Sequence, residues 1–153
     1  MIQRVQSIYL LLAAILTGLT AILPIATING TDGNSYITLT CLGIETNMQE
    51  FVGTHPWAIT IPWILSVLLP IVAIFSFKNR RKQIRWVNYA CSTNILLLLV
   101  ATSKCWSWAE AANGTPRPEI CALMPVIAVI STLLARRGIS RDEALVRAAD
   151  RIR

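Results

Sequence analysis

The sequence contains few charged residues and a single histidine. Charged residues make up 14% of its 153 residues, whereas 54% are hydrophobic. A soluble domain typically carries about 25% charged residues, so this chain has too few polar side chains to cover a soluble core. High hydrophobicity also excludes a disordered chain. The composition is therefore that of a small integral membrane protein, and the length leaves room for one domain.

The sequence also lacks the patterns of common catalytic and metal sites. It has no glycine-rich phosphate loop and no cluster of histidine with carboxylates. Its four cysteines are too few for a disulfide-dense secreted fold, and none of them forms a C-x-x-C motif. We therefore expect a protein that is not an enzyme and has no catalytic residue, no metal and no cofactor.

Four apolar runs predict membrane spans, because about 20 apolar residues cross a hydrocarbon core about 30 Å thick. The predicted spans are residues 7–28, 57–77, 86–103 and 120–135. The last run is short, but Arg136 and Arg137 follow it, and their aliphatic stems can extend the span to the interface. The expected fold class is an all-α membrane protein with a four-helix transmembrane domain over residues 1–137.

The cations are divided very unevenly between the two sides of such a bundle. Of the 14 Lys and Arg residues, only Lys104 and Arg117 fall in the segments of one side. Cytoplasmic loops carry an excess of Lys and Arg. The distribution therefore predicts that both termini and the loop 78–85 are cytoplasmic, and that the chain is a multi-pass protein of the cytoplasmic membrane.

The first outer loop has strand-like content. Residues 36–40 alternate and are rich in β-branched side chains, and turn-forming Asn and Gly residues precede them. This pattern is compatible with a small β-hairpin that caps the bundle, or with an irregular loop.

The last residues, 138–153, predict a separate short amphipathic helix in the cytoplasm. Gly138 is typical of a helix stop, and Ser140 with Glu143 forms a capping box that starts a new helix. An apolar stripe of Leu145, Ala149 and Ile152 follows. A free helix of this length is marginal in water, so burial of the stripe should hold it in place.

Two charged segments of the cytoplasmic face are candidates for contacts with a partner or with lipid. Asp142 and Glu143 suit contact with the basic loop 78–85, while the arginines further along the tail suit lipid phosphate or a partner. We expect membrane lipids with anionic headgroups as partners, together with a cytosolic or membrane protein; a homo-oligomer stays open and no nucleic acid is expected. The candidate residues are Lys78, Arg80, Arg81, Lys82, Arg85, Asp142, Glu143, Leu145, Arg147 and Arg151.

Two alternatives to a docking protein remain open. Polar residues inside the spans, with Thr17, Asn94 and Thr132 as candidates, would line the pore of a small oligomeric transporter or channel, although Asn94 also suits a structural bond between helices. Cys105 and Cys121 end neighbouring spans on the outer side, and a disulfide between them would need Cα atoms under about 7 Å apart. Such a bridge would suit a thiol–quinone redox protein.

Three stretches together resemble a known family. They are the start, Met1 to Leu12; the loop Phe77 to Arg80 with Gln83 to Arg85; and the end, Arg137 to Ile139 with Asp142 to Arg147 and Asp150 to Arg153. The chain resembles the family called domain of unknown function 4293, whose members are small bacterial inner-membrane proteins with four predicted spans. The resemblance implies a topology and an inner-membrane location, and it implies no activity.

Overall fold

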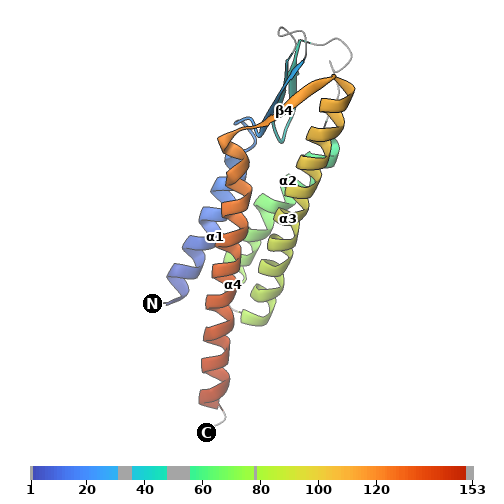
Figure 1. Cartoon of the computed structure of the whole chain (residues 1–153). Helices are drawn as coiled ribbons and strands as arrows, with labels where there is room; N and C mark the ends of the chain where they lie inside the picture. The colour runs from blue at the N-terminus through green and yellow to red at the C-terminus, as the bar shows by residue number, and fades with distance from the viewer. Residues whose placement is uncertain (1, 31–35, 48–55, 78, 151–153) are drawn as a thin grey trace.

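The computed structural model describes residues 2–30, 36–47, 56–77 and 79–150. Within them, four helices pack side by side and a small antiparallel sheet covers one end of the bundle (Figure 1). The helices are α1 (Ile2–Leu19), α2 (Trp57–Phe75), α3 (Arg80–Ala111) and α4 (Leu123–Asp150). Each packs against two neighbours, in the order α1, α2, α3, α4 and back to α1. Successive helices run in opposite directions, so α1 begins and α4 ends at the end opposite the sheet.

Three of these segments are long and apolar enough to cross a membrane. They are α2, α3 and the segment Ile120–Val146, which includes a short 3-10 turn (η2, Ile120–Ala122) before α4. The apolar part of α1 is shorter and covers Val5–Leu19. The protein is therefore mostly helical with three long apolar helices, and α1 completes the bundle.

The prediction of a continuous apolar helix over residues 7–28 is wrong beyond Leu19. The chain leaves α1 at Leu19 and enters strand β1 (Ala26–Gly30). Pro24 lies between the two elements, and proline cannot donate the backbone hydrogen bond that would continue a helix. In β1 the side chains alternate between buried and more exposed, with Ile28 fully buried. Apolar composition alone did not distinguish the helix from the strand that follows it.

The sheet joins segments that are far apart in the sequence. Strand order is β3-β2-β1-β4, and every pair is antiparallel. The remaining strands are β2 (Tyr36–Leu39), β3 (Ile44–Thr46) and β4 (Gly114–Pro118). The strand-like stretch at residues 36–40 contains β2, and it belongs to a four-stranded sheet rather than to an isolated hairpin. Strands β1 and β4 lie in segments for which the sequence predicts span and loop.

Strand β4 lies at an edge because of its prolines. Backbone N–H of Glu119 donates to Ile25 across the pair, at 2.9 Å. Backbone N–H groups point alternately to the two sides of a strand, so the nitrogens of Pro116 and Pro118 face away from β1. Because proline has no N–H to donate, this placement loses no hydrogen bond of the sheet. Gly114 ends the pairing, and a Cβ there would lie 2.6 Å from the carbonyl oxygen of Asn29. The strand therefore needs glycine at this position.

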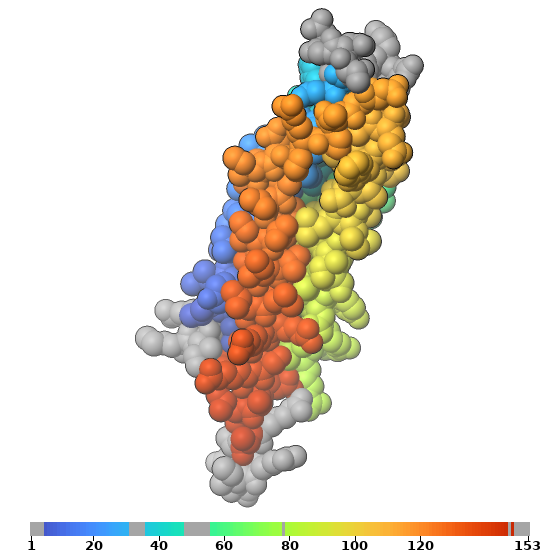
Figure 2. Space-filling model, in the orientation of Figure 1, coloured from blue at the N-terminus to red at the C-terminus, as the bar shows by residue number. Residues whose placement is uncertain are grey.

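Helices α3 and α4 are both longer than predicted. The third predicted span covers residues 86–103, whereas α3 begins at Arg80 and ends at Ala111. The predicted break at Gly138 is absent, because α4 runs without interruption to Asp150. Ser140 therefore lies inside a helix and caps nothing. In the space-filling view, α4 runs down the visible face of the elongated molecule, from below the sheet to the opposite end (Figure 2).

The core is divided between the two ends of the bundle. Near the sheet, a first cluster is formed by Ile25, Leu39, Cys41, Ile59 and Leu97. Near the opposite end, a second cluster, which we call the inner core cluster, is formed by Leu10, Ala73, Val87, Ala135 and Ile139. We call the first end the sheet end. We call the other the basic end, because it carries Arg80, Arg81, Lys82, Arg85, Arg136, Arg137 and Arg141.

Candidate functional site at the basic end

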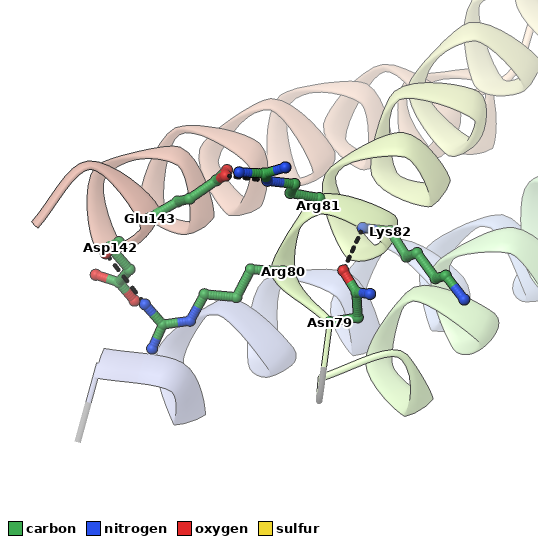
Figure 3. Close-up of polar contacts among 6 residues, drawn as sticks. All are labelled: Asn79, Arg80, Arg81, Lys82, Asp142 and Glu143. Carbon is green, nitrogen blue, oxygen red and sulfur yellow. Dashed lines mark hydrogen bonds and ion pairs between the residues drawn. The ribbon is translucent and has the colours of Figure 1, made fainter. Parts of the chain in front are cut away.

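Asp142 of α4 connects three helices at the basic end. Its carboxylate Oδ2 accepts a hydrogen bond from Nε2 of Gln6 in α1, at 2.6 Å. Its backbone carbonyl accepts from Nη1 of Arg80 in α3, at 3.1 Å (Figure 3). Gln6 is almost fully buried, so the amide needs this partner. Asp142 therefore holds α4 against both α1 and the start of α3.

A second contact joins α3 and α4 one residue further along. Nε of Arg81 lies 3.5 Å from Oε1 of Glu143, an ion pair in which the Arg81 side chain is 78% exposed (Figure 3). The start of α3 is fixed by Asn79, whose side chain accepts from the backbone N–H of Lys82 as a helix cap. The structure thus brings Arg80 and Arg81 together with Asp142 and Glu143.

Apolar packing at this end comes from residues that the sequence analysis did not select. Leu145 of the predicted stripe is 60% exposed and does not pack against the basic loop, whereas the side chains of Ala149 and Ile152 lie outside the described residues. Instead Ala135 and Ile139, about two to three turns earlier in α4, are buried against Leu10 and Val87. Because α4 is one helix through Gly138, its register is set by the bundle, and this register turns Leu145 outward.

Gly138 explains how α1 and α4 approach so closely. A Cβ at this position would lie 3.1 Å from Cγ of Gln6, tighter than ordinary contact. Small residues at membrane helix interfaces allow such close packing. Gly138 therefore serves packing in the helix interior, although glycine destabilises a helix by about 0.5–1 kcal/mol relative to alanine. The signal that could have indicated this is the polar Gln6, four residues before buried Leu10 on the same face of α1.

Among the other basic candidates, the two whose side chains the structure describes do not join these contacts. Lys82 and Arg85 are exposed on α3, and the Lys82 side chain extends away from α4 (Figure 3). Lys78 and Arg151 lie outside the residues that the structure describes. Arg147 belongs to α4, but its side chain lies outside the described part as well.

A polar cluster crosses the interior of the bundle nearer the sheet end. Asn94 of α3 is fully buried, and its Oδ1 accepts from the Thr17 hydroxyl of α1 at 3.2 Å. Nε1 of Trp63 donates to the Thr17 carbonyl at 2.8 Å, which satisfies a group left free by the end of α1. Thr132 is also buried, and its hydroxyl donates to the carbonyl of Val129. The three side chains considered for a pore are therefore buried and bonded within the chain.

All four cysteines are free thiols in the structure, so the bridge considered between Cys105 and Cys121 is not formed here. That these two can be joined stays a prediction. Cys41 is fully buried under the sheet, and its Sγ lies 3.3 Å from the Thr20 hydroxyl. Burial raises the pKa of the Cys41 thiol to about 11, against a smaller lowering by the Thr20 hydroxyl. This thiol is therefore protonated and unreactive at neutral pH.

An apolar groove of about 370 Å³ lies between α3 and α4 beneath β1 and β4. Leu97, Ala101 and Val126 line it, together with the rings of Pro116 and Pro118. The Cys105 side chain also borders the groove, whereas Cys121 does not. This arrangement does not bring two thiols together on the groove wall.

The chain belongs to the family described as domain of unknown function DUF4293, whose model matches residues 2–152. The resemblance noted from the sequence is thereby confirmed over almost the whole chain. No curated protein is similar enough to match. The family description specifies no activity.

Proposed function

We propose that this protein is a non-enzymatic docking protein of the bacterial inner membrane. In this proposal α1 is a fourth, short crossing, both termini are cytoplasmic, and the end of α4 is presented to a protein partner. The positive-inside rule supports the orientation, because all cations except Lys104 and Arg117 lie toward the basic end or in segments joined to it.

One observation carries the proposal. Helix α4 continues past the inner core cluster, and the contacts of Asp142 and Glu143 fix its direction. Beyond these contacts, Leu145 is 60% exposed and Val146 is 45% exposed. An extension that is held rigidly, lies outside the packed bundle and displays apolar side chains has the features of a helix that a partner can bind.

The orientation is tested with single cysteines in a background without the native ones. Ser140 and Thr115 are both exposed and lie at opposite ends of the molecule. In cells with an opened outer membrane, an impermeant thiol reagent should label Thr115→Cys and leave Ser140→Cys unlabelled until the inner membrane is opened. The reverse pattern would overturn the orientation.

The docking function is tested by photo-crosslinking in intact cells. A photoreactive amino acid in place of Leu145 should form an adduct with one defined protein, identified by mass spectrometry. The matched control is Leu133, which is 45% exposed on the apolar part of the same helix. The proposal is wrong if Leu145 yields no protein adduct, if both positions yield the same adduct, or if the adduct contains only a second copy of this chain.

A further inference from the structure

The first two turns of α3 carry cations with two different roles. Arg80 and Arg81 turn toward α4 and are engaged there with Asp142 and Glu143. Lys82 extends in another direction (Figure 3). Within the described part of the chain, neither the Lys82 ammonium nor the Arg85 guanidinium has an anionic partner, and both residues are exposed. Arg80 and Arg81 therefore hold α4 in place, whereas Lys82 and Arg85 are available to bind an anion.

The available pair borders a hollow of about 330 Å³. Its other walls are Trp86 and Tyr89, whose rings meet edge to face at 6.0 Å between centroids. Spacings of three, four and seven residues place all four side chains on one face of the helix. Trp86 also packs against the inner core cluster, so the ring is held in place.

The order of these side chains along α3 matches the order of chemical groups in a phospholipid. Lys82 is nearest the basic end of the bundle, and Tyr89 lies about 10 Å closer to its apolar middle at about 1.5 Å per residue. With α3 inserted as proposed, the cations would lie at the depth of phosphate and the amphipathic rings at the depth of the glycerol and ester groups, where Trp and Tyr are enriched in membrane proteins.

We propose that Lys82, Arg85, Trp86 and Tyr89 form a binding site for the headgroup of an anionic phospholipid. Lys82 and Arg85 donate to the phosphate oxygens, and the guanidinium can do so with two parallel bonds. The Trp86 N–H and the Tyr89 hydroxyl are donors for the ester and glycerol oxygens. The site rests on the proposed membrane insertion of α3, and it does not depend on a protein partner of α4.

The test measures lipid retention by the full-length protein in mild detergent, by native mass spectrometry with phosphatidylglycerol or phosphatidylcholine added. The double variant Lys82→Gln/Arg85→Gln should bind phosphatidylglycerol about 10- to 30-fold more weakly, since each basic residue near an anionic lipid contributes about a five-fold factor. The matched control, Arg136→Gln/Arg137→Gln, removes the same charge from exposed positions of α4 and should retain binding. The exchange Lys82→Arg/Arg85→Lys should also retain it.

Three outcomes would overturn the site. They are equal weakening in the two Gln double variants, equal retention of phosphatidylcholine by the parent, and displacement of the lipid by millimolar inorganic phosphate, which would indicate a free-phosphate site. All four substituted residues are exposed, and an unchanged unfolding midpoint of each variant shows that the fold is intact. Failure of the Leu145 adduct would leave this site standing, and failure here would leave the proposed docking function standing.

Discussion

The two ends of the bundle are stabilised in different ways. At the sheet end, backbone hydrogen bonds between four strands join segments from residues 26 to 118, and the cluster below them is apolar. At the basic end, side chains join the helices instead. A buried amide donates a hydrogen bond to a carboxylate, a guanidinium donates to a backbone carbonyl, and one exposed ion pair is formed. The sheet end therefore depends on strand pairing, whereas the basic end depends on helix packing with charged contacts around it.

This difference indicates which end can take part in regulated contacts. Backbone ladders are insensitive to salt, but exposed ion pairs weaken as ionic strength rises. We expect the basic end to respond to lipid charge and ionic strength, and the sheet end to behave as a fixed cap.

The largest expected effect is a disruption of the sheet end alone. Ile28→Asp places a carboxylate at a fully buried position of β1 with no positive partner, and such changes commonly cost more than about 4 kcal/mol. Hydrogen exchange should become fast in β1 and β2 and change less at the basic end. Asn29→Asp adds the same charge at the exposed neighbouring position and is the control. Equal protection in parent and Ile28→Asp would contradict the prediction.

The next effect concerns the inner core. Leu10→Ala should lower the free energy of unfolding in detergent micelles by about 2–5 kcal/mol, because Leu10 of α1 is fully buried in a cluster with residues of α2, α3 and α4. Leu11 is 50% exposed, so Leu11→Ala should cost much less. Similar losses in the two variants would mean that the basic end is not held by packing.

Disrupting the polar cluster in the interior of the bundle should lower the free energy of unfolding less than either change above. Asn94→Leu removes the bond between α1 and α3 and should cost about 0.6–2 kcal/mol. Thr17→Val removes the same bond from the other side. In a double-mutant cycle, the double variant should lose less unfolding free energy than the sum of the losses in the two single variants. Full additivity would show that the bond contributes no coupling.

The ion pair should have a still smaller effect on stability. Arg81→Gln should change the free energy of unfolding by about 0–1 kcal/mol, because exposed pairs contribute little. Any loss should disappear at high salt, unlike the loss from Leu10→Ala. A large loss of unfolding free energy that does not depend on salt would contradict this prediction, because it would mean that Arg81 contributes to the packing of α3 on α4.

The stability of the sheet end should depend on pH in the alkaline range. The pKa of Cys41 is raised from 9.0 to about 11, so the folded state holds the thiol proton more tightly than the unfolded state. This contribution is fully present below pH 9 and is lost as the pH rises toward 11. In unfolding measurements, Cys41→Ala should remove this part of the alkaline loss. The same alkaline slope in parent and variant would exclude the thiol as its source.

Part of the candidate site was predictable from residue chemistry. The acidic residues 142 and 143 predicted contact with the basic loop, and Glu143 does pair with Arg81. Arg80 instead donates to the backbone carbonyl of Asp142, a contact that the acidic side chain does not explain. The contribution of Gln6 was not predictable in this way, since a glutamine near the start of an apolar run has no fixed partner until α1 is packed on α4. The spacing of Leu145 with Ala149 and Ile152 predicts a shared apolar face, but this spacing does not reveal that α4 continues through Gly138 in a register set by the bundle.

The sequence by itself determined the long apolar helices, the uneven distribution of cations, and the local preference for strand at residues 36–39. These features depend on composition and short-range patterns. Only the tertiary structure decided that residues 26–30 form a strand, that a segment with two prolines completes the sheet, and that α4 passes through Gly138. Each of these outcomes depends on a partner distant in the sequence: β4 for β1, and Gln6 for Gly138. Local propensities could not encode these pairings, because the free energy that selects them arises only when the distant segments meet.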